Sequence, residues 1–457
     1  MSKMSYGIWL SQSHVGRILL LGLLIVLLQI PIKSIQGLVF ERQATQHSAI
    51  NEVQQKWGQE QRIIGPILLV PYREKREWQD THTGAKQSAT DTKQAIFLPD
   101  DFKASSELVK EARHRGIFEV PLYQSVVELD GHFSKPDFKI WGIKENDVIW
   151  DKARLVVMVS DARAIQKQAM INWNGKDYYF APGTDEATSN YEGYHVELTG
   201  LDQQKSQYTY SIKLHLNGSK GIYFAPLGKD SLINISASWP DPSFQGKWLP
   251  SSRQVTKDGF TSTWQIPYLG RNFPQQMKNY YSVQENIQNS FVGVDLITPV
   301  DNYRMAERST KYVMLFLLLT FIVIWLIEVL AKLRVYFLQY VFIGAALCLF
   351  YLLELSLSEH IGFYWAYVIA TTAIISMVSA YSYVVLKTGK RAAIIGSILI
   401  GMYLYLFALL QEQNYALLIG SIGLFAMLGV VMYVTRNIDW FKLTQLSVPK
   451  SAPAEQS

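Results

Sequence analysis

Cysteine is almost absent from this 457-residue chain, and so are the patterns that mark familiar catalytic sites. With Cys348 alone, no disulfide can form within the chain, so its folded parts must be stabilised by packing. There is no G-x-S-x-G, H-E-x-x-H or P-loop motif, and the eight histidines include no i,i+4 pair. Nothing here indicates an enzyme, a cofactor or a metal site, and Cys348 is interpreted as a small packing residue.

A strong charge imbalance is missing from the middle of the chain. The whole sequence has 43 Lys and Arg against 38 Asp and Glu, and 32 of each kind fall between residues 34 and 311. The central segment is therefore neutral, and the formal charge of +5 belongs to its flanks. This distribution excludes the nucleic-acid binding that a pI near 8.9 would otherwise suggest.

Long apolar runs, by contrast, are abundant. Six of them are long enough to cross the roughly 30 Å hydrocarbon layer of a bilayer as helices. They lie at about residues 16–35, 312–331, 335–355, 363–386, 393–411 and 415–434. The sequence therefore predicts a protein of the lipid bilayer, with one large polar segment between its first and second spans.

The first apolar run has two interpretations. Its charged start (Lys3, Arg17) and apolar centre are typical of a signal peptide, but its exit, PIKSIQ (31–36), is not an A-x-A-like cleavage site. The following segment, 37–58, is compatible with a helix that continues the same run. An uncleaved anchor is therefore favoured over a cleaved signal.

Lysine and arginine are absent from two short connections between spans, 354–362 and 411–415. Ten such residues flank the opposite ends of the spans: Lys3, Arg17, Lys332, Arg334, Lys387, Lys390, Arg391, Arg436, Lys442 and Lys450. Positive residues near spans are kept preferentially on the cytoplasmic side. Both chain ends are therefore predicted to be cytoplasmic.

Four divisions follow from this topology. Residues 1–35 would be the cytoplasmic N-terminus and anchor, and residues 36–311 a periplasmic β-rich domain with an initial helix. Residues 312–434 would form a bundle of five transmembrane helices, and residues 435–457 a cytoplasmic tail. The predicted fold class is an α + β membrane protein with six spans and antiparallel sheets in the exported domain.

The β prediction depends on short segments rich in β-branched and aromatic residues, bounded by Gly, Pro, Asn or Asp. They are residues 66–72, 94–99, 153–161, 208–216, 231–239 and 291–297. Alternation at period two in 208–216 indicates one buried face. The polar insertion 73–93 is expected to be an exposed loop.

Three other segments of the exported domain leave alternatives open. INWNGKDYYFAPG (171–183) and LHLNGSKGIYFAPLG (214–228) each predict a hairpin at Asn-Gly, with the strand ending at Pro. Chance similarity between two hairpins is favoured over an internal duplication. WPDPSFQGKWLP (239–250) is interpreted as a rigid loop with packed rings, the alternative being a binding edge.

Ionisable residues are nearly absent from the spans. Glu328 lies four residues before Lys332, which predicts a helical ion pair without a transport role. Ion-coupled transporters usually keep such groups nearer the bilayer centre. Their absence favours a non-enzymatic envelope protein over the alternative, a transporter or lipid-handling protein that uses the C-terminal bundle.

The stretch ELSLSEHIGF places Glu354, Glu359 and His360 between two apolar runs, and Arg308 and Lys311 precede the second span. Glu354 lies 20 residues beyond the inner end of its span, roughly 30 Å along a helix, which predicts the outer interface. Glu359 and His360 are expected in the turn that follows.

This candidate cluster has three interpretations. The acids could simply mark a hydrated outer loop. A metal site is disfavoured, because two carboxylates and one imidazole lack a clear further ligand. The third is an ionic latch, in which Glu354 or Glu359 pairs with Arg308 or Lys311 and docks the stem of the exported domain onto the bundle; His360 would tune it between pH 5 and 8.

Several stretches, in the same order along the chain, resemble the CreD family of bacterial inner-membrane proteins. They are GPILLVPY, VSDARAI, WPDPSFQGKWLP, ERSTKYVMLFLLLTF, LLELSLSEHIGF and VTRNIDWF. The resemblance implies an inner-membrane location, a periplasmic domain and a role in the envelope response to β-lactam or colicin stress. It supplies no catalytic residues. It is compatible with a periplasmic or cell-wall partner, and nothing in the sequence specifies an oligomeric state.

Overall fold

The chain folds into two compact units, residues 1–46 with 300–457, and residues 47–299. The computed structural model describes residues 14–79, 86–184, 192–199, 201–297, 302–331, 333, 335–412 and 415–436. Several residues used above to predict orientation lie outside this described part: Lys3, Lys332, Arg334, Lys442 and Lys450, with residues 437–457 of the predicted tail.

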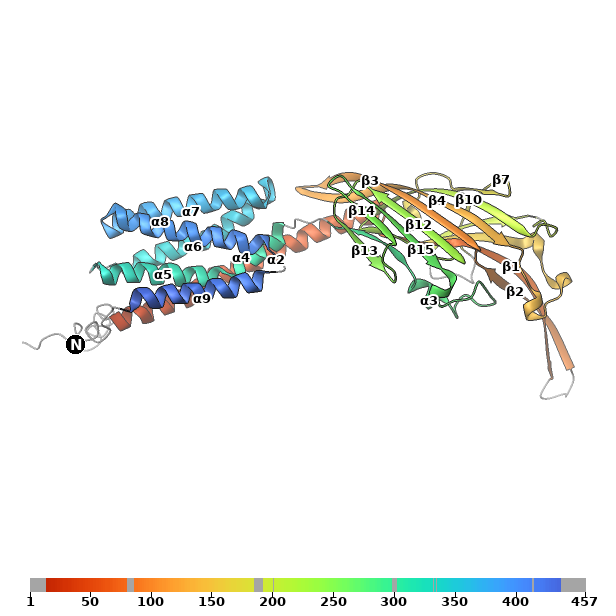
Figure 1. Ribbon diagram of the computed structural model, residues 1–457, viewed down its shortest axis with the longest axis horizontal. Helices are drawn as coiled ribbons and strands as arrows, with labels where there is room; N and C mark the ends of the chain where they lie inside the picture. Colours follow the sequence, from red (N-terminus) through yellow and green to blue (C-terminus); the bar gives the residue numbers. More distant parts are fainter. Residues whose placement is uncertain are drawn as a thin grey trace, which may run out of the picture. The chain divides into compact units, whose positions relative to one another are not determined.

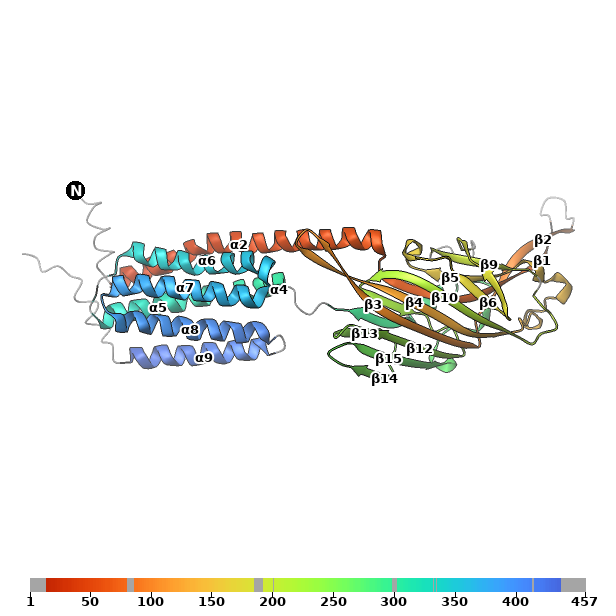
Figure 2. The same ribbon diagram turned by 90° about the horizontal axis from the view of Figure 1, so that it is seen from above.

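The first unit is a bundle of helices that run alongside one another (Figure 2). Six helices of the described chain are long and apolar enough to cross a membrane. They are α2 (His14–Trp57), α5 (Val313–Leu330), α6 (Phe337–Ile361), α7 (Phe363–Leu386), α8 (Gly389–Gln411) and α9 (Ala416–Thr435). The six predicted spans are confirmed, and α2 continues well beyond its apolar run, as the sequence suggested.

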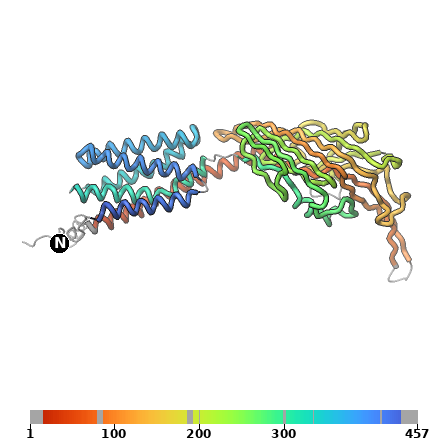
Figure 3. Tube along the Cα trace, viewed as in Figure 1, coloured from red at the N-terminus to blue at the C-terminus, as the bar shows by residue number. Residues whose placement is uncertain are grey.

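Segments far apart in the sequence lie side by side in this unit (Figure 3), and their buried side chains form one apolar core. Leu24, Leu28 and Ile32 of α2 belong to the same buried cluster as residues of α5 to α8. A Cβ placed on Gly344 of α6 would lie 2.5 Å from Leu28 Cδ1, so glycine permits the close approach of these two helices. Cys348 is buried in this core as a packing residue.

The second unit contains two sheets packed on each other (Figure 1). The path of the first sheet runs β13 (Pro242–Gly246), β17 (Val292–Leu296), β11 (Gly221–Phe224), β1 (Gln61–Gln79), β5 (Ala153–Val159), β9 (Glu192–Leu198) and β8 (Ala181–Pro182), with β2 (Lys86–Phe97) and β16 (Gln276–Met277) beside it. The second runs β14 (Ser252–Val255), β15 (Phe260–Pro267), β12 (Asp230–Ala237), β3 (Asp101–Arg115), β4 (Phe118–Ser134), β10 (Gln207–Ser219), β6 (Met170–Trp173) and β7 (Lys176–Tyr179).

Antiparallel pairing dominates these sheets, as predicted, and all six predicted strand segments overlap strands. Among the described strands, only β1 with β11 and β3 with β12 pair in parallel. The alternating apolar residues of the two sheets face each other in one core, which includes Leu68, Val157, Leu129, Ile212 and Trp264. The other face of the first sheet is covered by residues 273–291, which include the short helix α3 (Gln284–Gln288).

The prediction of a loop at 73–93 is wrong. Residues 68–79 pair continuously with residues 86–97, so the polar insertion is the far part of a long two-stranded ribbon, which projects from the sheet in Figure 1. Polar residues are exposed on both faces of this ribbon. No alternation of apolar residues was therefore available to predict strands there.

The two Asn-Gly segments turn out to differ. Asn174 and Gly175 have positive φ and join β6 to β7 as the predicted hairpin. Asn217 and Gly218 instead lie inside β10, paired with Gln124 and Tyr123 of β4. The second predicted hairpin is wrong because the chain passes there from one sheet to the other.

The segment 239–250 packs its rings into the domain, as expected, but it also contains a short strand, β13, which the prediction of a loop did not include. Trp239 is 5% exposed, and its Nε1 donates to the carbonyl of Ile297 at 2.8 Å. The carbonyl of Trp248 accepts from Trp264 Nε1 at 3.0 Å.

Candidate functional site

A short helix that the sequence reasoning missed, α4 (Asn302–Lys311), packs against the bundle. Its residues were assigned to the exported domain because they are mostly polar. The signal that could have revealed it is the spacing of its buried residues, Tyr303, Ala306, Ser309 and Thr310, on one helical face. α4 and α2 are the two segments through which the chain leaves and enters the β unit.

Glu359 of α6 binds both of these segments. Its Oε1 accepts from the Tyr303 hydroxyl of α4 at 2.8 Å. Arg42 of α2 reaches both carboxylate oxygens, with Nε 3.1 Å from Oε1 and Nη2 3.1 Å from Oε2. The Glu359 side chain is 5% exposed and that of Arg42 is 44% exposed, so the carboxylate is screened from water while the guanidinium that binds it in two places faces solvent.

Glu354 lies five residues earlier on α6 and is fully buried. Its Oε2 accepts from the Ser309 hydroxyl of α4 at 2.6 Å, while Oε1 has no hydrogen-bond partner in the described part of the chain. Asn302, at the start of α4, donates to the carbonyl of Ser358 at 3.1 Å. The polar side chains of α4 thus pair with successive turns of α6.

Arg308 points toward α8 rather than toward the acids. Its Nη1 lies 3.0 Å from the carbonyl oxygen of Leu410, and its Nη2 lies 2.9 Å from that of Leu409 and 3.2 Å from that of Glu412. These carbonyls lie at the C-terminal end of α8 and have no partners within the helix. A cation at this end also interacts favourably with the partial negative charge of the helix dipole. We call Arg42, Tyr303, Arg308, Ser309, Glu354 and Glu359 the α4 cluster.

The structure therefore brings the predicted acids to α4 but gives them different partners. Arg308 lies five residues after Tyr303, about 140° around a helix, and so cannot reach the same face of α6. Lys311 pairs with Glu307 of its own helix at 3.0 Å. His360 is exposed and has no hydrogen bond or ion pair within the described residues.

The predicted connection 354–362 is also wrong, because α6 continues through Ile361. Glu359 and His360 lie in its last turns, and Gly362, with φ of +77°, joins α6 to α7. The apolar run ends earlier than the helix, so hydropathy placed this boundary too early.

Near the opposite end of α6 lies a second buried acid, Glu328 of α5, whose partners could not be predicted from spacing along the sequence. Arg17 of α2 forms an ion pair with Glu328 of α5, which also accepts from the Tyr340 hydroxyl at 2.8 Å and the Val335 N–H at 3.2 Å. Glu328 is 2% exposed. The expected partner Lys332 lies outside the described residues.

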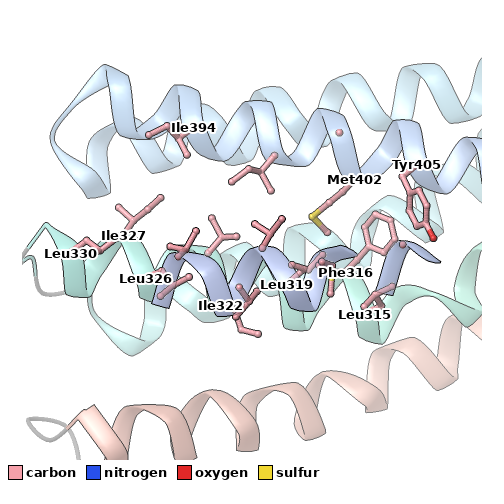
Figure 4. Close-up of a pocket in the computed structure, with 18 residues that line it drawn as sticks. Leu315, Phe316, Leu319, Ile322, Leu326, Ile327, Leu330, Ile394, Met402 and Tyr405 are labelled. Carbon is pink, nitrogen blue, oxygen red and sulfur yellow. The ribbon is translucent and has the colours of Figure 1, made fainter. Parts of the chain in front are cut away.

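An apolar groove opens between α5, α8 and α9 (Figure 4), with a volume of about 560 Å³. Leu319 and Leu326 of α5 and Met402 of α8 are among its lining residues. All of α9 is described, and none of its residues is buried. Such a surface suits the acyl chains of a bilayer.

Among the described residues, no group of three or more His, Cys, Asp and Glu is arranged to hold a metal ion. The acids of the α4 cluster instead have a hydroxyl or a guanidinium as partners. These hydrogen bonds and the ion pair join α2 and α4 to α6.

Replacing Ser309 with alanine should lower the free energy of unfolding by about 1–2 kcal/mol, because the buried Glu354 carboxylate loses its one hydrogen-bond donor among the described residues. Thermal melting of the purified protein in detergent micelles would measure this. Thr310→Ala is the matched control, since the Thr310 hydroxyl donates within its own helix to the Glu307 carbonyl. Equal melting temperatures for Ser309→Ala and wild type would contradict the role given to this bond.

These features define a class: a multi-pass membrane protein with a β-rich domain inserted between its first and second spans. The family model described as "Inner membrane protein CreD" matches residues 13–441. Inner membrane protein CreD of Escherichia coli (strain K12) is 29% identical over 440 residues, which are 94% of each chain. The chain belongs to the CreD family of inner-membrane proteins, which confirms the resemblance found in the sequence.

The comparison with two solved structures identifies no common fold. Two crystal structures of an M1 zinc metallopeptidase mutant from Deinococcus radiodurans, one with a Tyr-Ser-Ala substrate, have 10% and 9% sequence identity to this chain. They cover 44% and 47% of this chain, and this chain covers 42% and 53% of theirs, with TM-scores of 0.21 and 0.22. Values this low support no common fold and no common activity.

Proposed function

We propose that this protein supports cell-envelope integrity during β-lactam- or colicin-type stress without catalysing a reaction. Its β domain contacts a periplasmic or cell-wall partner, and its helices anchor that domain in the inner membrane. The observation that carries the proposal is the α4 cluster, in which Glu359 binds both chain segments that connect to the β unit. A partner that pulls on the β unit would act directly on Arg42 and Tyr303.

In the proposed arrangement residues 1–35 form the cytoplasmic N-terminus and the membrane anchor, and residues 36–311 lie in the periplasm. Residues 312–434 form the bundle of five spans, and residues 435–457 form a cytoplasmic tail. Five positive residues of the described chain support this arrangement: Arg17, Lys387, Lys390, Arg391 and Arg436. They lie at helix ends opposite those of the α4 cluster, and such residues favour the cytoplasmic side.

A reporter that is active only in the periplasm tests this topology. It should be active when fused after Gly221 or Glu359, and inactive after Gly389 or at the C-terminus. Activity after Gly389 would reverse the proposed orientation of α7 and α8.

The role itself is tested in a strain that lacks this protein. Loss of the protein should lower resistance to β-lactam or colicin, and expression of the wild-type chain should restore it. Unchanged resistance in the deletion strain, under conditions in which the protein is made, would contradict the envelope role.

The apolar groove supports a second candidate, a lipid-handling protein in which an acyl chain occupies the space between α5, α8 and α9. Gly401 lines the groove and has no atom within 4 Å of an added Cβ, so Gly401→Leu should fill it without a clash. Gly429→Leu on α9 is the control, because Gly429 is equally open but does not line the groove.

Lipid handling predicts that Gly401→Leu retains fewer phospholipids after purification and fails to restore stress resistance, while Gly429→Leu matches wild type. Quantitative mass spectrometry of the bound lipid gives the first readout. Wild-type lipid retention and wild-type resistance in Gly401→Leu would remove this candidate.

A further inference from the structure

A polar pocket of about 340 Å³ lies in the β unit, beside the last turns of α2. Its lining includes an unusual concentration of carboxamides: Asn51, Gln54 and Gln55 from α2, and Gln59 from the link to β1. Each carboxamide can both donate and accept hydrogen bonds. The pocket therefore presents matched donors and acceptors rather than an apolar surface.

Gln54 is the informative member of this set. It is 4% exposed, its side-chain amide makes no hydrogen bond within the described chain, and the amide atoms are not among the fully enclosed ones, so they are reached from the pocket. A buried amide without a partner is costly, so native proteins normally satisfy such groups. Because Gln54 lines the pocket, its amide is available to pair with water or with a ligand held there.

Lys220 supplies a positive charge at the same place. It joins β10 to β11 with φ of +64°, a left-handed conformation that costs free energy for a residue with a Cβ. Its side chain is exposed and has no ion pair among the described residues. The chain thus holds an uncompensated ammonium group beside the carboxamides.

The second cation, Arg62, is fixed in position and partly neutralised. Its guanidinium lies 5.3 Å from the ring centroid of Tyr223 and 5.5 Å from that of Phe291. Its Nε donates to the Glu60 carboxylate at 2.7 Å. The net unpaired charge of the pocket is therefore that of Lys220.

The hydroxyls of the pocket are already occupied. Ser160 Oγ donates to the Glu60 carbonyl at 2.5 Å and accepts from the Arg62 N–H at 2.9 Å. Ser219 Oγ donates to the Gly58 carbonyl at 2.9 Å. Both serines therefore hold the walls in place, and neither is free to act as a nucleophile.

Asp161 fixes the link that carries Gln59. Its carboxylate accepts from the Gln59 N–H at 3.3 Å and from Arg163 Nε at 2.9 Å. Burial by itself would raise the pKa of Asp161, but the Arg163 side chain and the Gln59 N–H outweigh it and leave the pKa below its usual value. Asp161 stays charged at neutral pH and keeps this wall of the pocket ordered.

We propose that this pocket binds a short peptide with a free carboxylate, the carboxamides pairing with peptide groups and Lys220 with the carboxylate. The inference rests on the proposed function, because it names the chemistry of the envelope partner. A saccharide fits less well: none of the described residues that line the pocket is Trp, Tyr or Phe, so no ring is available for a sugar to stack on.

The test is isothermal titration of the full-length protein in detergent micelles with N-acetyl-trialanine, as the free acid and as the C-terminal amide. The wild type should bind the acid about tenfold more tightly than the amide, the ratio expected for one favourable charge pair of about 1.4 kcal/mol. Lys220→Asn keeps a residue that tolerates positive φ but removes the charge, so the acid-to-amide ratio should fall to about one. Lys205→Asn, outside the pocket, should leave the ratio unchanged.

Gln54→Leu provides a second, independent readout. It should weaken the binding of both peptides at least severalfold without lowering the melting temperature, because it breaks no hydrogen bond of the free protein. A lowered melting temperature would mean that Gln54 is a structural residue.

The proposal is overturned if wild type fails to bind the acid at millimolar concentration, if Lys220→Asn keeps the acid preference, or if chitotriose binds and the peptides do not. These outcomes are separate from the envelope role. Stress resistance that does not depend on the protein would contradict that role even where the peptide binds.

Discussion

Replacing Arg17 with alanine should destabilise the helix bundle by about 3–5 kcal/mol, the cost typical of leaving one member of a buried ion pair unmatched. Glu328 would remain 2% exposed with only the Tyr340 hydroxyl and the Val335 N–H as partners. The low dielectric of the surroundings makes the unpaired carboxylate expensive. Melting of the purified protein, and its steady-state level in the membrane, would both report the loss.

The matched control is the double variant Arg17→Leu/Glu328→Leu. It removes both charges, and replacement of a buried pair by apolar residues is often neutral or stabilising. The double variant should therefore melt closer to wild type than Arg17→Ala does. A double variant less stable than the single one would show that the pair is not the source of the effect.

Replacing Arg308 with alanine should cost about 2–4 kcal/mol, because three carbonyls at the end of α8 lose charged hydrogen-bond donors. Lysine should restore little of this stability. The guanidinium reaches Leu409, Leu410 and Glu412 at once through two nitrogens, whereas an ammonium is a single compact group. Thermal melting of Arg308→Ala and Arg308→Lys measures both effects.

This pair of variants separates two accounts of Arg308. If it served mainly as a charge for Glu354 or Glu359, as the sequence first suggested, Arg308→Lys would melt near wild type. If Arg308 instead stabilises the C-terminal end of α8 through the several N–H donors of its guanidinium, Arg308→Lys would melt at nearly the same temperature as Arg308→Ala. Lys311→Ala is the control on the same helix, since Lys311 makes only an exposed i,i+4 pair and should change stability by less than about 0.5 kcal/mol.

The features that sequence predicted well are those that a local pattern determines. Six apolar runs specified six spans, because crossing a bilayer demands about 20 apolar residues in a row. The strand at 208–216 was found because its apolar residues alternate toward one buried face. The strands of the ribbon at 73–93 were not predicted, because their residues are polar on both faces. Hydrogen bonding between two such strands produces no alternation of apolar residues in the sequence.

The candidate site was predicted only in part, because its partners are distant in sequence. Glu354 and Glu359 stood out as acids beside apolar runs, but Arg42 lies 317 residues from Glu359 and Arg17 lies 311 residues from Glu328. No spacing rule connects such residues. α4 was missed because its buried face is only four residues wide and is hidden among charges.

The central claim is that Glu359 links α2 and α4 to the bundle and that this link is needed for envelope function. The most direct measurement is stress resistance of charge-swap variants in a strain lacking the wild-type protein, at matched protein levels. Glu359→Arg should impair resistance, and adding Arg42→Glu should restore part of it, whereas adding Arg308→Glu should not. Full resistance in Glu359→Arg alone, or rescue by Arg308→Glu and not by Arg42→Glu, would contradict the account.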